Sequence, residues 1–299
     1  MKLATTTCDF AKYTDNQEMA MEYIKQAGFC YVDYSFDMDA DYKNGIYSSD
    51  FDGYIDKIKR KADLLGLTFV QAHSPLGKPI AEGNSAFVED TIKCVRACSK
   101  LGIKNLVVHS GYDFNISKEE TFEKNKAFYN KILCEAEKYE INILTENFNK
   151  MCIENLYWID NASDLLKLIE YVDHPLFHAV WDTGHANMQK TPQDECLRLL
   201  GNHVYALHVH DNFGDEDSHM APFFGTMNMA SLMKGLRDIN YNGYFTFEAC
   251  NVFAPERLRT TFSDDTRFMQ APLELKLKAE KLIYETGKLV LGEYGIFEE

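Results

Sequence analysis

Short apolar segments alternate with amphipathic segments along the whole chain. Segments such as NLVV before His109 and FHAVW before Asp182 are continuously apolar, which is typical of parallel strands that helices cover on both faces. The pattern predicts eight strands, at residues 2–8, 29–35, 67–73, 105–110, 142–147, 177–182, 204–210 and 243–249. Helical periodicity follows most of them, at about residues 16–27, 51–65, 84–101, 118–139, 162–172, 192–200, 228–239 and 271–289.

Eight strand–helix units in one series predict an α/β fold, a (β/α)8 TIM barrel, in which residues 1–299 form a single domain. Glycines stand before several strands, in AGFC, LGLTF, LGIKN and YNGYF, where the end of the preceding helix favours glycine. No proline- or serine-rich linker interrupts the series. A chain of 299 residues that is 45% hydrophobic is long enough to bury the core of such a barrel.

Polar side chains follow the predicted strands at the end where such barrels build their functional face. Glu146, Asp182, His208 and Glu248 lie in the segments NILTENF, AVWDTGH, YALHVHDN and YFTFEAC. Carboxylates and imidazoles attached to buried strands are unfavourable unless a charge compensates them. Two Glu, one Asp and one His supply mixed oxygen and nitrogen ligands, so we predict a divalent metal ion, Mn²⁺, Zn²⁺, Mg²⁺ or Co²⁺, at the mouth of the barrel.

His73 and His109 also lie at predicted strand ends on this face. A single His or Asp at a strand end more often caps a helix or binds a loop, so the prediction rests on the set. The histidines at strand beginnings are expected to serve stability: His174, His178 and His203.

The segment after His208 also contains polar residues that we expect to be structural. His210 alternates with His208 along the predicted strand, so its side chain is expected on the other side of that strand. Asp211 and Asn212 are expected to shape the following loop and to orient His208.

Composition narrows the class of partner. A net charge of −15 disfavours nucleic acid, because affinity for polyanions depends on Lys and Arg. The eight cysteines are scattered without a CxxC pair, which indicates a reducing cytosol. The first residues do not resemble a signal peptide, and no apolar segment approaches the roughly 18 residues that span a bilayer. We therefore expect a cytoplasmic protein without a membrane segment.

The segments that carry the candidate ligands resemble the xylose isomerase-like barrels. This family contains sugar and sugar-phosphate isomerases and epimerases and, as a distant branch, endonuclease IV. The similarity extends from AHSP at 72–75 to FTFEAC at 245–250, and its most specific parts are WDTGH at 181–185 and LHVHDN at 207–212. In the epimerase branch two Glu, one Asp and one His hold a single metal. The resemblance implies that role for Glu146, Asp182, His208 and Glu248, and substrate binding for His185.

The predicted function is isomerisation or epimerisation of a small sugar, polyol or sugar phosphate. A metal that coordinates a carbonyl and the neighbouring hydroxyl stabilises the enediolate that forms when a carbon-bound proton leaves. Glu146 and Glu248 are the predicted catalytic base and acid. Return of the proton to the opposite face of the same carbon epimerises the sugar, and return to the adjacent carbon isomerises it. The residues leave both outcomes open.

The endonuclease IV branch gives an alternative, a metal-dependent phosphodiesterase that acts at abasic sites. Its trinuclear zinc site uses nine side chains, and the resemblance gives counterparts for all of them: His73, His109, Glu146, Asp182, His185, His208, Asp217, His219 and Glu248. In the sugar interpretation His73, His109, Asp217 and His219 join His185 in binding substrate. A sugar dehydratase on the same site and a non-catalytic sugar binder are further alternatives.

The loops favour a small carbohydrate over DNA. SFDMDADYKNG and GDEDS are acidic, which opposes binding of a phosphate backbone. PFFGTMN departs from the PGxGxI/V-type stretch of the family. No glycine-rich phosphate cradle is visible, which slightly favours an unphosphorylated substrate. The long segment 251–272 suits a lid or a subunit contact in a homo-oligomer, and its basic residues are Arg257, Arg259 and Arg267.

Overall fold

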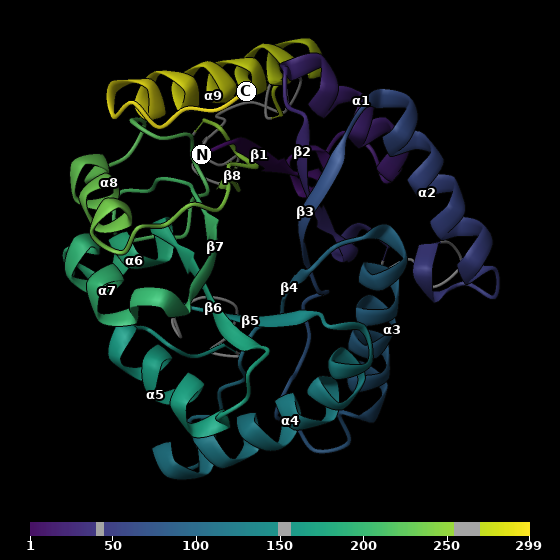
Figure 1. Ribbon diagram of the computed structural model, residues 1–299, viewed down its shortest axis with the longest axis vertical. Helices are drawn as coiled ribbons and strands as arrows, with labels where there is room; N and C mark the ends of the chain where they lie inside the picture. Colours follow the sequence, from purple (N-terminus) through teal and green to yellow (C-terminus); the bar gives the residue numbers. More distant parts are fainter. Residues whose placement is uncertain (40–44, 149–156, 254–269) are drawn as a thin grey trace, which may run out of the picture.

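The computed structural model describes residues 1–39, 45–148, 157–253 and 270–299. Its strands form a ring of parallel neighbours in the order β7-β6-β5-β4-β3-β2-β1-β8 (Figure 1). A bridge between Val209 and Phe247 joins the two ends of this order. The strands are β1 Leu3–Thr6, β2 Tyr31–Ser35, β3 Thr68–His73, β4 Asn105–Val107, β5 Asn142–Glu146, β6 Phe177–Asp182, β7 Val204–His208 and β8 Phe245–Phe247. The predicted (β/α)8 TIM barrel is therefore confirmed.

Helices surround this ring on the outside (Figure 1). They are α1 Gln17–Ala27, α2 Phe51–Leu65, α3 Ser85–Leu101, α4 Lys118–Tyr139, α5 Ala162–Val172, α6 Thr183–Gln189, α7 Gln193–Leu200, α8 Met229–Asp238 and α9 Leu273–Glu293. Short 3₁₀ turns cover Thr7–Phe10, Phe36–Asp39, Gly45–Tyr47 and Gly201–His203.

Alternate residues of the strands pack on opposite sides of the ring. Leu106 and Ile143 are fully buried in the large apolar core that the helices share with the strands. Val107 and Leu144, one position further along β4 and β5, join Val180 and Ala206 in a separate small cluster. This alternation follows from the two-residue period of a strand. It places an apolar layer inside the barrel, below the polar residues at the strand ends.

Helix ends explain much of the agreement between the predicted and observed elements. The C-caps of α1, α2 and α3 are Gly28, Gly66 and Gly102, all left-handed, as predicted. The prediction for YNGYF was wrong, because α8 ends at Asp238 and Asn240 is the left-handed residue there, with φ 53°. Asparagine tolerates this conformation better than most residues, so Gly243 is not needed as the cap.

Two further differences affect the site. Helix α6 was not predicted; it begins directly after β6 because the side chain of Asp182 accepts a hydrogen bond from the backbone N–H of His185. The strand predicted at 204–210 ends at His208. Most of segment 251–272, including Arg257, Arg259 and Arg267, lies outside the described residues.

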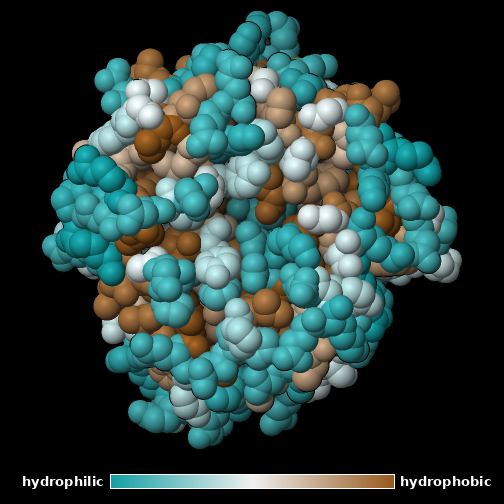
Figure 2. All heavy atoms as spheres, viewed as in Figure 1, coloured by the Kyte–Doolittle hydropathy of each residue, from teal (hydrophilic) through white to brown (hydrophobic). Residues whose placement is uncertain are grey.

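The surface in Figure 2 carries hydrophilic residues over much of the face seen down the barrel, with hydrophobic patches between them. Among the described residues, no helix has the length and apolar character needed to cross a membrane. The seven cysteines that the structure describes are all free.

Candidate active site

Nine predicted side chains converge where the strands end. They come from the carboxyl ends of β3 to β8 and from the segments that follow: His73, His109, Glu146, Asp182, His185, His208, Asp217, His219 and Glu248. Each of them has a nitrogen or oxygen atom within 3.4 Å of another member. The sequence therefore predicted which side chains come together.

Glu146, Asp182, His208 and Glu248 form what we call the central cluster. One ligand-type atom from each lies within 4.8 Å of the others. Nδ1 of His208 lies 3.1 Å from Oε1 of Glu146 and 3.4 Å from Oε2 of Glu248. Asp182 and His208 are fully buried, whereas the side chain of Glu248 is 18% exposed. The cluster is therefore open to solvent on the side of Glu248.

A pair of imidazoles borders Glu146 on its other side. Nε2 of His109 lies 2.8 Å from Oε2 of Glu146, and Nε2 of His73 lies 3.1 Å from Nε2 of His109. Nδ1 of His73 donates to the carbonyl of Ser74 at 2.7 Å, which leaves its Nε2 without a hydrogen in the neutral ring. Two imidazole nitrogens and one carboxylate oxygen thus face a common point.

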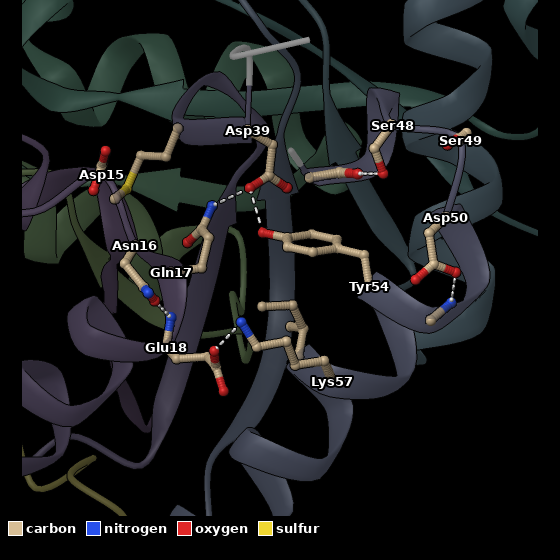
Figure 3. Close-up of a pocket in the computed structure, with 14 residues that line it drawn as sticks. Asp15, Asn16, Gln17, Glu18, Asp39, Ser48, Ser49, Asp50, Tyr54 and Lys57 are labelled. Atoms are coloured by element: carbon tan, nitrogen blue, oxygen red, sulfur yellow. Dashed lines mark hydrogen bonds and ion pairs between the residues drawn. The ribbon is translucent and has the colours of Figure 1, made fainter. Parts of the chain in front are cut away.

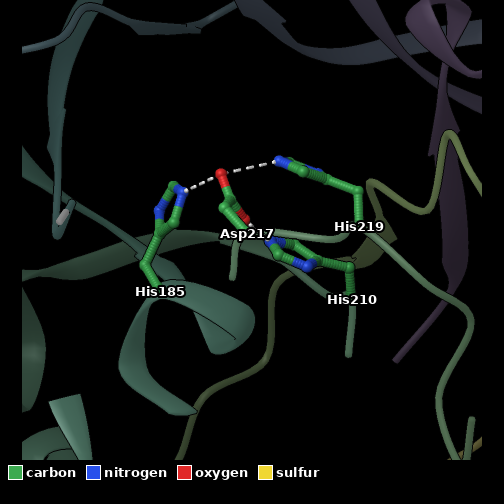
Figure 4. A group of neighbouring side chains, drawn as sticks. All are labelled: His185, His210, Asp217 and His219. Atoms are coloured by element: carbon green, nitrogen blue, oxygen red, sulfur yellow. Dashed lines mark hydrogen bonds and ion pairs between the residues drawn. The ribbon is translucent and has the colours of Figure 1, made fainter. Parts of the chain in front are cut away.

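A second group, the distal cluster, consists of His185, His210, Asp217 and His219 (Figure 4). Nε2 of His185 and Nε2 of His219 each lie 3.2 Å from Oδ2 of Asp217. Their Nδ1 atoms donate to backbone carbonyls, those of Asn147 and Glu248, each at 2.9 Å. Such an outer hydrogen bond orients a metal-binding histidine and leaves its inner nitrogen available.

His210 lies in the distal cluster, so the expectation that it points away from the site was wrong. The expectation assumed that the strand continues to residue 210, but β7 ends at His208. The ring of His210 is fully buried and stacks on His219 with centroids 3.9 Å apart. Its Nε2 is 3.0 Å from Oδ2 of Asp182 without the alignment of a hydrogen bond. A Cβ at Gly184 would lie 1.9 Å from this ring, which explains the glycine in WDTGH.

Electrostatic coupling inside the site is strong. Burial lowers the pKa of His208, but the carboxylates of Glu248 and Glu146 outweigh it and hold that pKa well above its ordinary value. Burial raises the pKa of Glu146, but His208, His109 and His185 lower it well below the usual range. For His219, the lowering by burial is outweighed by Asp217, which raises the pKa to about 10. Without a cation, protons on the imidazoles balance the carboxylates.

The residues of the central cluster fit a divalent cation. Oδ2 of Asp182 is buried without a hydrogen-bond partner, a costly state for a carboxylate oxygen. Three carboxylates and one imidazole form a ligand set that suits Mn²⁺, Zn²⁺, Mg²⁺ or Co²⁺. A metal and a proton compete for the same ligand atoms. The protonated imidazoles therefore supply the positive charge that a bound cation would supply.

Two residues that support the site were not predicted from the sequence. The side chain of Asn147 holds the backbone of Asp182 with two hydrogen bonds. It accepts from the N–H of Asp182 at 2.7 Å and donates to its carbonyl at 2.8 Å. Asp33 contacts His208 from inside the barrel. Its signal in the sequence is a single charge in the middle of the predicted strand FCYVDYS.

The expectation for Asp211 is confirmed in part. Its carboxylate accepts hydrogen bonds from the N–H groups of residues 223, 225 and 227 and shapes that loop.

A separate pocket of about 590 Å³ lies between the N-terminal ends of α1 and α2 (Figure 3). Its lining includes Asp39 and Gln17 and none of the nine candidate residues. Asp39 accepts hydrogen bonds there from the hydroxyls of Tyr54 at 2.6 Å and Tyr34 at 2.9 Å. Each oxygen of Asp39 thus has a partner, so we assign the chemistry to the strand ends and not to this pocket.

Comparison with known proteins agrees with the fold. A model of the family described as xylose isomerase-like TIM barrel matches residues 21–270. An uncharacterized protein of Methanocaldococcus jannaschii is 28% identical over 171 residues, 54% of this chain and 57% of that protein. The fructoselysine 3-epimerase of Shigella flexneri is 29% identical over 117 residues, 36% of this chain and 42% of that enzyme. The aligned regions thus span about half the length of these relatives.

Among solved structures, the chain is similar to a D-psicose 3-epimerase with D-tagatose from Clostridium cellulolyticum H10. The TM-score is 0.74 with 16% identity, over 97% of this chain and 99% of that one. At this identity the likeness supports the fold alone.

Proposed function

The chain belongs to the xylose isomerase-like TIM barrel family, and from that premise we propose that it is a divalent-metal-dependent isomerase or epimerase of a small carbohydrate. The observation that carries the proposal is the convergence of Glu146, Asp182, His208 and Glu248 at the carboxyl ends of the strands. Enzymes of this fold place their chemistry there. The name of the related fructoselysine 3-epimerase supports the substrate class.

Two glutamates flank His208 and carry the proposed proton transfer. A bound divalent cation would act as a Lewis acid that makes a proton on carbon beside a carbonyl easier to remove. Glu146 and Glu248 accept and return that proton. Glu146 is buried with a low pKa, whereas the Glu248 side chain reaches solvent and exchanges its proton between turnovers. His185, Asp217 and His219 border the cluster and bind the sugar hydroxyls.

The test is incubation of the metal-loaded protein with ketohexoses in D₂O, with NMR to locate the label. We expect an epimer or isomer that carries deuterium at the reacting carbon, and no conversion by Glu248→Gln. Conversion without deuterium contradicts proton transfer through an exchangeable carboxyl group. Absence of conversion for every ketose contradicts the sugar assignment.

The distal cluster and His73 together favour one alternative, a phosphodiesterase with several metals. His73, His185 and His219 all turn an Nε2 inward while Nδ1 binds a carbonyl, which suits additional cations. Metal content per chain separates the proposals: we expect one tightly bound ion. Asp217→Ala and His219→Ala should then weaken substrate binding strongly and change the metal content per chain little. Three ions per chain, a loss of ions in these variants and cleavage of an abasic duplex would favour the phosphodiesterase.

A further inference from the structure

Asp33 is a buried carboxylate that contacts the central cluster from inside the barrel. It lies in the middle of β2 and is 1% exposed. Its Oδ2 accepts a hydrogen bond from Nε2 of Gln71 at 2.9 Å and lies 3.1 Å from Nε2 of His208. Because β2 and β7 are not neighbours in the ring, this second contact crosses the interior of the barrel.

The contact determines which ring nitrogen of His208 keeps its hydrogen when a cation binds. Nε2 donates to Asp33, which is not a candidate ligand. Nδ1 lies 3.1 Å from Oε1 of Glu146 and 3.4 Å from Oε2 of Glu248, both candidate ligands, so a cation at the central cluster would displace the hydrogen from Nδ1. His185 and His219 have the opposite arrangement, with Nδ1 bound to carbonyls and Nε2 turned inward. His208 thus needs a partner on its Nε2 side, and Asp33 is that partner.

Asp33 is held in place by a chain of hydrogen bonds. Gln71 donates to it through Nε2, and Oε1 of Gln71 accepts from the hydroxyl of Thr246 at 3.2 Å. The residues are fully or almost fully buried, so neighbouring side chains restrict their movement. The chain connects β2, β3 and β8 to His208 on β7.

We propose that Asp33 is a positioning residue that fixes His208 with Nδ1 toward the metal. This inference rests on the proposed function, because it presumes that the central cluster binds a divalent cation. Carboxylates that hold a metal-binding histidine in this way typically change metal affinity by about 10–100-fold when they are removed.

The first experiment measures Mn²⁺ affinity from the EPR signal of free Mn²⁺. We expect Asp33→Leu to weaken binding by about 10–100-fold. Asp33→Asn, which keeps an oxygen that accepts from Nε2, should retain most of the affinity. Asp39→Leu is the matched control, because Asp39 is also buried but contacts Gln17, Tyr34 and Tyr54; the Mn²⁺ affinity of this variant, when folded, should equal that of the wild type. A folded Asp33→Leu variant with wild-type affinity would overturn the inference.

The second experiment needs no variant. A crystal structure of the wild-type protein soaked with Mn²⁺ should show Nδ1 of His208 on the metal and Nε2 on Asp33. Coordination through Nε2 overturns the role of Asp33 and leaves the proposed function intact. A wild-type protein that binds neither Mn²⁺ nor Co²⁺ overturns the metal centre of the proposed function itself, which distinguishes the two failures.

Discussion

Two buried groups of charged residues in this barrel balance their charge in different ways. Next to β1 and α9, Lys276 balances the carboxylate of Glu280, to which its Nζ donates at 2.8 Å. Burial and the neighbouring Glu280 raise the pKa of Asp9 in this group well above its ordinary value. At the strand ends, Glu146 and Asp182 have imidazoles as their charged partners in the described part of the chain. The first group carries a lysine ammonium ion, whereas the second depends on imidazoles, whose ring nitrogens give up a proton when they bind a metal.

This difference separates a structural site from a binding site. Lys276 is almost fully buried, and its pKa, lowered by burial but raised more by Glu280 and Asp9, stays above its ordinary value. It therefore stays charged and leaves no role for an added cation. The imidazoles of the central cluster exchange their protons for a metal at little structural cost. A buried carboxylate cluster is thus a better candidate metal site when histidine, and not lysine, balances it.

The largest effect is expected from Glu146→Gln and Glu248→Gln. Each removes a carboxylate from the central cluster and a group that transfers the proton, so turnover of the ketose should fall by about 10²–10⁴-fold or more. Far-UV circular dichroism should show an unchanged fold. Glu280→Gln is the control from the other group and should retain its kcat when folded. Near-normal activity in either of the two site variants would refute the assignment.

Lys276→Met tests the structural group. The substitution leaves Glu280 buried without its cation, and breaking a buried pair in this way typically costs about 3–5 kcal/mol of unfolding free energy. The loss should appear in urea denaturation at pH 7, while Mn²⁺ affinity of the folded variant stays that of the wild type. An unchanged midpoint would show that Lys276 does not balance the carboxylate of Glu280.

The fold could be predicted from the sequence because the eight strands and most of the helices have a strong local pattern, with α6 as the exception. The convergence of the nine candidate residues could also be predicted, since parallel strands bring their carboxyl ends together whatever the loops do. His210 was misplaced because the end of β7 depends on the tertiary contacts of the loop. Asp33 was visible as a charge within an apolar strand, but its partner His208 lies 175 residues away. Contacts across the barrel interior depend on the ring geometry, which one sequence does not specify.

Metal binding should stabilise the protein in a pH-dependent way. At a free metal concentration of 100 times Kd, the unfolding free energy should rise by about 2.7 kcal/mol. Since Glu248 and Glu146 outweigh burial and hold the pKa of His208 well above 6.5, protonation of this ligand stabilises the metal-free protein fully below pH 6.5. That contribution is lost as the pH rises through the raised pKa. Metal-induced stabilisation should therefore grow over this range, as measured by thermal melting with and without Mn²⁺. A shift that is independent of pH would contradict competition between metal and protons.

Asp39 shows a third way to bury a carboxylate, with donors from Gln17 and Tyr54, which Figure 3 shows, and from the hydroxyl of Tyr34. None of these partners is a cation. Burial raises its pKa, the hydrogen bonds lower it, and the net value is about 6. The folded state therefore keeps a proton that the unfolded state releases above its pKa of 3.8. Stability from this group is present below pH 3.8 and is lost as the pH rises through about 6, at a cost of about 3 kcal/mol at most.

Asp39→Asn removes the charge but also one acceptor, which costs about 1 kcal/mol. We therefore expect the variant to be slightly less stable than the wild type at pH 4 and about 1–2 kcal/mol more stable at pH 7. Urea denaturation of both proteins at pH 4, 5, 6 and 7 measures the difference. If that difference does not change with pH, Asp39 ionises as easily in the folded protein as in the unfolded chain. Hydroxyl donors would then balance a buried carboxylate as well as Lys276 does, and a histidine-balanced cluster would no longer stand out as the site that needs a metal.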